Sequence, residues 1–98
     1  PYIPKGYTLS FQMYTITVEA KLRNKLLNFL KKNNIEASAH FDPPLHLQKY
    51  LKKYNKKRLT ETEKLSKQII TLPIFPDMTK KEVTYVTETI NRFYKDNN

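Results

Sequence analysis

Apolar side chains recur along the chain with two periods, one of two residues and one of three to four, which predict both strands and helices. β-Branched and aromatic residues fill 11–19, a composition typical of a strand. Apolar and polar positions alternate over 35–41, which predicts a second strand with one buried face. The buried face is expected to hold Ile35, Ala37, Ala39 and Phe41, and the polar face Glu36, Ser38 and His40. A short third strand is expected over 69–72, closed by Pro73.

Apolar residues three and four positions apart predict helices over 20–33 and 79–94, a short helix after Pro44 and another that begins at Thr60. The polar side chains of the first helix, including Arg23, are expected to face water. The stripes expected to be buried are Leu22, Leu26, Leu27, Phe29 and Leu30 in the first helix, Leu47, Tyr50, Leu51 and Tyr54 in the short one, and Val83, Val86, Ile90 and Phe93 in the last.

Helix starts are marked twice by the Thr-x-x-Glu pattern of a capping box, at Thr60–Glu63 and at Thr79–Glu82. Residues 1–10 are punctuated by proline and glycine and predict an extended entry. The order is therefore β-α-β-α-α-β-α in one domain, 1–98. We expect an α+β fold: a small, mainly antiparallel three-stranded sheet with helices packed on one face.

Charge and composition narrow the class of protein. The formal net charge is +9, from 18 Lys+Arg against 9 Asp+Glu, which could indicate an anionic partner. The cations are almost all Lys and accompany many Asn, Ile and Tyr, so a compositional bias explains them better and nucleic acid is the less favoured partner. The absence of Cys excludes disulfide scaffolds and thiol catalysis. No apolar run has the length of a membrane span and no signal peptide is visible, so we expect a cytoplasmic protein without membrane contact.

Candidate chemistry is confined to one proline-stiffened segment, His40 to His46. Two His and Asp42 could suggest a metal, but two prolines and the lack of a further His disfavour chelation. Both His could equally be structural hydrogen-bonding residues. The single glycine, Gly6, cannot build a phosphate-binding loop, and the lysines are expected on solvated faces.

Five segments, in order and spacing, resemble the DegT/DnrJ/EryC1/StrS family of PLP-dependent sugar-nucleotide aminotransferases. Each alone is weakly specific, but together they extend through essentially the whole chain. They are Ser10–Ile16, Leu30–Ala37, the loop His40–Gln48, the pair Thr62–Ser66 with Ile70–Pro76, and Thr79–Tyr94.

The resemblance implies the C-terminal small domain of a fold-type I PLP enzyme, which acts as a homodimer. Such an enzyme moves an amino group from glutamate to a nucleotide-linked keto sugar for polysaccharide or cell-surface sugars. The cofactor lysine belongs to a large domain absent here, so this chain is expected to bind no PLP and to be inactive alone, without catalytic residues. The family's cleft positions correspond to His40, Phe41 and His46. Phe41 stands where the family often has Tyr, and the Asp-Pro-Pro segment that follows is one of several variants in the family. The sugar specificity of family members therefore cannot be transferred to this chain.

An alternative function is a free-standing basic module that binds nucleic acid or protein. The gene sequence upstream of Pro1 distinguishes the two functions, because only the aminotransferase requires a PLP-binding domain there. If the large domain is missing, an apolar patch is expected to be exposed, built from Tyr2, Ile3, Tyr7, Phe11 and Met13.

Overall fold

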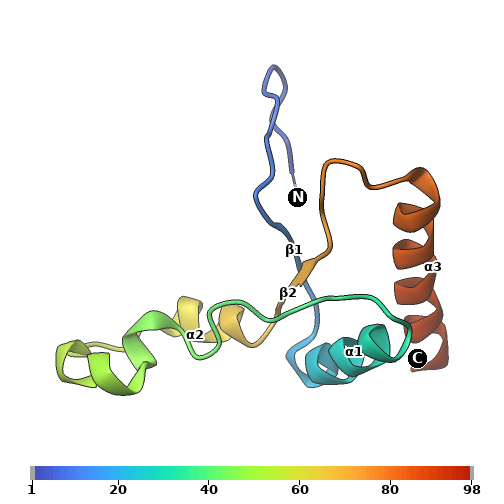
Figure 1. Cartoon of the computed structure of the whole chain (residues 1–98). Helices are drawn as coiled ribbons and strands as arrows, with labels where there is room; N and C mark the ends of the chain where they lie inside the picture. The colour runs from blue at the N-terminus through green and yellow to red at the C-terminus, as the bar shows by residue number, and fades with distance from the viewer. Residues whose placement is uncertain (1, 98) are drawn as a thin grey trace.

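A computed structural model describes residues 2–97 and shows an α+β arrangement (Figure 1). In chain order the elements are β1 (Tyr14–Thr17), α1 (Ala20–Lys32), the 3-10 helices η1 (Leu45–Leu47) and η2 (Lys49–Tyr54), α2 (Thr60–Ser66), β2 (Ile69–Leu72) and α3 (Lys80–Asp96). Pro1, where the extended entry was expected to begin, lies outside the described residues, as does Asn98. Among the described residues, no helix is both long enough and apolar enough to cross a membrane.

The sheet is antiparallel, as expected, but it has two strands where three were expected. β1 pairs with β2, with Thr15 opposite Thr71. The expected strand over 35–41 is reduced to a single bridge, in which Ser38 and Thr71 exchange both backbone hydrogen bonds at 3.1 and 2.8 Å. β2 therefore lies between β1 and Ser38.

Two features of the backbone explain why the third strand stops at one bridge. In an antiparallel ladder, the next hydrogen-bonded partner of Glu36 would be Pro73, which has no N–H to donate. On the other side of Ser38, the φ of Phe41 is 58°, a left-handed conformation that turns the chain out of the sheet.

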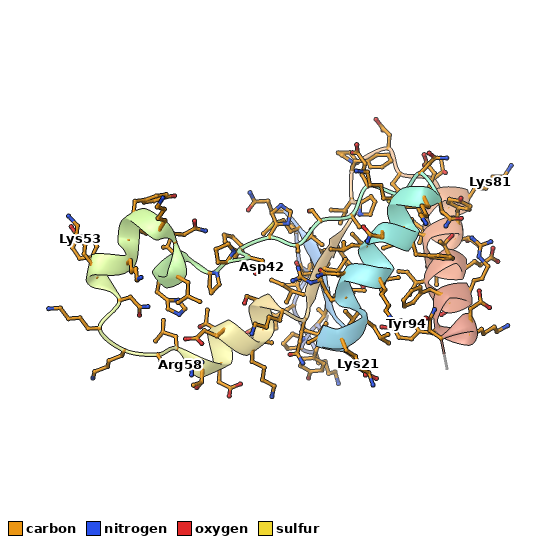
Figure 2. All side chains as sticks on the ribbon, turned by 90° about the horizontal axis from the view of Figure 1, so that it is seen from below. Lys21, Asp42, Lys53, Arg58, Lys81 and Tyr94 are labelled. Atoms are coloured by element: carbon orange, nitrogen blue, oxygen red, sulfur yellow. The ribbon has the colours of Figure 1, made fainter. Side chains whose placement is uncertain are left out.

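The hydrophobic core lies between β2, α1 and α3. α1 packs against both β2 and α3, and Figure 2 shows it between the sheet and α3. Leu26, Leu30 and Ile70 have no exposed surface. Leu26 and Leu30 belong to the apolar stripe expected for the first helix, and its other members, Leu22, Leu27 and Phe29, are partly buried against the core. The buried hydrophobic residues are Leu26, Leu30, Ile35, Ile70, Val86 and Phe93. Of the helices expected on one face of the sheet, α1 packs against β2, and α3 packs against α1.

The last helix is buried along Val86 and Phe93, as expected, but Val83 is 49% exposed. Thr89, which lies between Val86 and Phe93 in the sequence, is buried at 2% exposure. Its hydroxyl donates to the carbonyl oxygen of Tyr85 at 2.7 Å. A buried hydroxyl is tolerated there because it has this partner.

One of the two predicted capping boxes forms. At α3, Glu82 donates its backbone N–H to Thr79 Oγ1, and its carboxylate accepts from the Thr79 backbone N–H at 2.7 Å. At α2 the prediction is wrong: Leu59 is the N-cap, and Thr60 is already inside the helix without a side-chain cap.

Residues 41–66 form an arm that projects away from the body (Figures 1 and 2). The short helix expected after Pro44 is instead the two 3-10 helices η1 and η2, and its expected stripe is not buried. Tyr50 and Tyr54 are 75% and 66% exposed. A helix is buried only where another element covers its apolar face, and the sheet does not reach this segment.

The N-terminal segment also leads away from the core (Figure 1). Four of the five side chains expected in an apolar patch are exposed: Tyr2, Ile3, Tyr7 and Met13. Phe11 is half-buried, with its ring centroid 5.3 Å from that of Tyr14.

Candidate functional site

His40 lies on the polar face of the sheet, beside its central strand. Its Nδ1 is 2.9 Å from Thr71 Oγ1 and 3.2 Å from Ser38 Oγ. Thr71 Oγ1 is in turn 3.3 Å from Thr15 Oγ1, so a row of hydroxyl groups crosses the strands and ends at the imidazole. The residue is exposed, and among the described residues no hydrogen bond engages Nε2. This nitrogen can therefore meet a ligand.

Phe41 lies beside His40 rather than in the core. The alternation of 35–41 placed it on the buried face, but it is 66% exposed because its left-handed φ ends the alternation. The two ring centroids are 6.3 Å apart with 52° between the ring planes. His40 and Phe41 thus form a small exposed wall with one polar ring and one apolar ring.

Arg23 anchors the base of the arm. Its side chain is 8% exposed, and its Nη2 donates to Asp42 Oδ2, the residue that follows Phe41. The expectation that Arg23 faces water is therefore wrong. The Nε atom is buried without a hydrogen-bond partner, which makes the pair with Asp42 the main compensation for burying this charge.

His46 belongs to a separate cluster inside the arm. Its Nε2 is 3.4 Å from Glu63 Oε1, and both side chains are 14% exposed. Arg58 Nη2 donates to the other carboxylate oxygen, Oε2, at 2.5 Å. The pKa of Glu63 is lowered from 4.5 to about 2, mainly by the hydrogen bond from Arg58, with the contact to His46 acting in the same direction and burial opposing both. Glu63, the residue expected in a capping box, therefore joins η1 to α2.

The two His share no hydrogen-bond partner, and the described residues contain no group of three or more His, Cys, Asp or Glu placed to hold a metal. A substrate contact of His46 rests on the sequence resemblance alone. Its contact with Glu63 corresponds to the alternative interpretation, in which this His is a structural hydrogen-bonding residue.

The described residues do not fit pyridoxal phosphate. A lysine that forms a Schiff base needs a desolvated pocket, and every Lys of the chain is exposed. Gly6 has a φ of 87°, but nothing within 4 Å of the position of a Cβ, so no cradle is built around it.

Sequence reasoning missed two residues that support this wall, Thr71 and Arg23. For Arg23 a signal was present: it precedes Leu26 and Leu30 by three and seven positions, which places it on the apolar face of the helix. For Thr71 no local signal existed, because its partners Thr15 and His40 lie 56 and 31 positions away.

Comparisons with known proteins give a consistent result. The family model of the DegT/DnrJ/EryC1/StrS aminotransferase family matches residues 3–91. The chain is 37% identical over 87 residues to a pleiotropic regulatory protein of Geobacillus stearothermophilus, covering 87% of this chain and 23% of that protein. It is 36% identical over 81 residues to GDP-perosamine synthase of Escherichia coli O157:H7, covering 83% of this chain and 22% of the synthase.

A solved structure from Bacillus cereus ATCC 10987, assigned to the PLP-dependent aminotransferases, superposes with a TM-score of 0.74 at 31% identity. The match covers 82% of this chain and 22% of that one. The chain therefore spans about a fifth to a quarter of the length of the proteins it matches.

Proposed function

The chain belongs to the DegT/DnrJ/EryC1/StrS aminotransferase family, and we propose that it is the C-terminal small domain of an enzyme that aminates a nucleotide-linked keto sugar. Glutamate is the proposed amino donor, and the complete enzyme is proposed to be a cytoplasmic homodimer that uses pyridoxal phosphate. Two relatives support the sugar-nucleotide substrate by their names, GDP-perosamine synthase and dTDP-3-amino-3,6-dideoxy-alpha-D-galactopyranose transaminase from Aneurinibacillus thermoaerophilus.

Within that enzyme, the role of this chain is to form a wall of the substrate cleft. The observation that carries the proposal is the exposed His40 ring, held at Nδ1 by Thr71 at 2.9 Å, with Nε2 unengaged among residues 2–97. Phe41 offers an apolar ring next to it. Such a pair can bind and orient a sugar through one hydrogen bond and one stacking face.

The cofactor and the proton transfers are assigned to the large domain outside this chain, because no Lys here is buried. The chain alone is therefore expected neither to bind pyridoxal phosphate tightly nor to transaminate. A saturable visible absorbance change on adding pyridoxal phosphate, abolished by replacing one specific Lys, would contradict this.

The test of the cleft role is His40→Ala in the full-length enzyme, with the glutamate and sugar half-reactions measured separately. Loss of one polar contact is worth about 1–2 kcal/mol, so the KM for the nucleotide sugar is expected to rise about five- to thirty-fold with little change in kcat. Tyr85→Phe is the control, because it also removes one polar contact, the 3.0 Å hydrogen bond to the Asn33 carbonyl, but in α3. Collapse of the glutamate half-reaction with the sugar half-reaction spared would show that the assignment is wrong.

The alternative function, a free-standing basic module, is favoured by one observation. Six of the 18 Lys and Arg fall within residues 49–58, and no acidic residue occurs from 43 to 60. This clustering exceeds what a uniform compositional bias produces. Exposed Tyr50 and Tyr54 lie among these cations, and Lys53 Nζ is 4.9 Å from the Tyr54 ring centroid. Basic side chains interleaved with aromatic rings are a surface that single-stranded nucleic acid uses.

Two measurements separate the functions. An open reading frame upstream of Pro1 that encodes a PLP domain supports the aminotransferase domain. Salt-dependent binding of a single-stranded oligonucleotide to this chain, lost when Lys52, Lys53, Lys56 and Lys57 are replaced by Gln, supports the basic module.

A further inference from the structure

Thr71 makes the shorter of the two side-chain contacts to His40 Nδ1. It lies in the central strand, it is 8% exposed, and its backbone N–H and C=O are both used by Ser38. Its remaining polar group, the hydroxyl, lies 2.9 Å from His40 Nδ1 and 3.3 Å from Thr15 Oγ1. Thr71 is β-branched, so the rotation of its side chain about χ1 is restricted, and the strand fixes its backbone.

We propose that Thr71 is a positioning residue: its hydroxyl donates to His40 Nδ1 and thereby fixes the imidazole in the tautomer that carries its proton on Nε2. The consequence of this inference for substrate binding rests on the proposed role of His40 in the cleft. Thr71 itself touches no substrate.

The direction of the hydrogen bond follows from the chemistry of the two groups. A neutral imidazole has one donor and one acceptor nitrogen, and a hydroxyl can play either role. The imidazole nitrogen is a far stronger base than an alcohol oxygen, so donation from the hydroxyl to the nitrogen is the more favourable arrangement. Ser38 Oγ approaches the same Nδ1 at 3.2 Å, and two hydroxyls that converge on one nitrogen suit a lone pair that accepts. Thr15 can then donate to Thr71, which completes the row.

This arrangement specifies what His40 can recognise. With Nδ1 occupied as an acceptor, Nε2–H faces outward as a donor. The group of the ligand that meets it is therefore an acceptor, such as the oxygen of a carbonyl, a sugar hydroxyl or a phosphate. A ligand that offers only an N–H or an ammonium group at this point is rejected.

The tautomer can be measured on this chain directly, by nitrogen NMR of 15N-histidine-labelled protein at pH of about 8.5, two units above the ordinary imidazole pKa. The signals of His40 are assigned by their loss in His40→Gln. In the wild type, Nδ1 is expected to resonate as an unprotonated ring nitrogen and Nε2 as a protonated one. Protonated Nδ1 overturns the proposal.

Three variants separate the hydroxyl of Thr71 from its packing. Thr71→Val keeps the shape and removes the hydroxyl, so the two His40 nitrogens are expected to move toward averaged shifts. Thr71→Ser keeps the hydroxyl and is expected to restore the wild-type pattern. Thr89→Val makes the same chemical change at a buried site in α3 and is expected to leave His40 unchanged. A Thr71→Val spectrum identical to the wild type overturns the proposal.

The full-length enzyme supplies the functional measurement. Thr71→Val is expected to raise the KM for the nucleotide sugar about three- to ten-fold with kcat nearly unchanged, and Thr71→Ser to reverse most of the increase. An unchanged KM would contradict the substrate part of the inference. If the full-length protein shows no sugar amination, the proposed function fails, but the tautomer measurement still decides the role of Thr71.

Discussion

Arg23 of α1 and Asp42 at the start of the arm form an ion pair that connects the hydrophobic core to the segment carrying His40 and Phe41. The Arg23 side chain is 8% exposed and that of Asp42 is 34% exposed. The pair holds the chain where Phe41 adopts its left-handed φ of 58°, a conformation that costs energy for a residue other than glycine. The exposed wall is thus attached to the buried face of a helix.

The first prediction concerns this pair. Asp42→Asn leaves the buried guanidinium without its counter-charge and is expected to destabilise the chain by about 1–3 kcal/mol, less than for a fully buried pair because Asp42 is partly solvated. Arg23→Met keeps the apolar stem and removes the charge, so its cost is expected to be smaller. Urea unfolding measures both. A larger loss for Arg23→Met than for Asp42→Asn would show that the guanidinium stabilises this junction through contacts other than its pairing with Asp42.

The second prediction uses two identical sequence motifs with different structures. Thr79→Ala removes the N-cap of α3 and is expected to cost about 1 kcal/mol. Thr60→Ala is the matched control, because the same Thr-x-x-Glu pattern forms no cap at α2 and the loss is expected to stay within about 0.5 kcal/mol. Thermal or urea unfolding compares them. Equal losses would mean that Thr60 caps α2 in solution.

The segment 35–41 shows which structural features the sequence can predict and which it cannot. The alternation over 35–41 correctly assigned Ile35 to the core and His40 to the polar face, because side-chain direction in an extended segment is local. It could not show that Pro73 would fall opposite Glu36 if the ladder continued, which prevents a full third strand, since strand register is not local.

The candidate site was only half predictable. His40 and Phe41 were chosen as candidates through the resemblance, whereas Thr71 is defined by partners that are distant in sequence. The two Thr-x-x-Glu motifs differ because Arg58 and His46 recruit Glu63, and no pattern within the motif reports this competition. Charge alone suggested a solvated Arg23, although its spacing to Leu26 matched the apolar face.

The third prediction concerns the pH dependence of the arm. The pKa of Glu63 is lowered to about 2, first by the hydrogen bond from Arg58, whereas the ordinary value is 4.5. A lowered folded-state pKa means that the carboxylate stabilises the folded arm above pH 4.5, and that this contribution is lost as the pH falls from 4.5 toward 2.

Carboxyl NMR titration measures the pKa, and amide hydrogen exchange of α2 measures the opening of the arm. Arg58→Ala is expected to raise the pKa of Glu63 toward 4.5 and to shift arm opening to higher pH. Lys57→Ala removes the neighbouring positive charge without touching this pair and serves as the control. An unchanged pKa in Arg58→Ala would contradict the pairing.

The last prediction concerns association of the chain through its N-terminal segment. Tyr2 and Tyr7 are 85% and 69% exposed, and Ile3, Leu9 and Met13 are exposed in the same segment. This segment leads away from the core, so its apolar side chains are in contact with water. Pairing with a second chain would remove them from water. Solution scattering and sedimentation are therefore expected to show association that increases with concentration. Tyr7→Ser with Met13→Ser is expected to weaken it, whereas Tyr50→Ser with Tyr54→Ser, an equal number of changes on the arm, is expected to leave it intact. A monomer at all concentrations, or equal weakening by both double variants, would show that this segment does not mediate pairing.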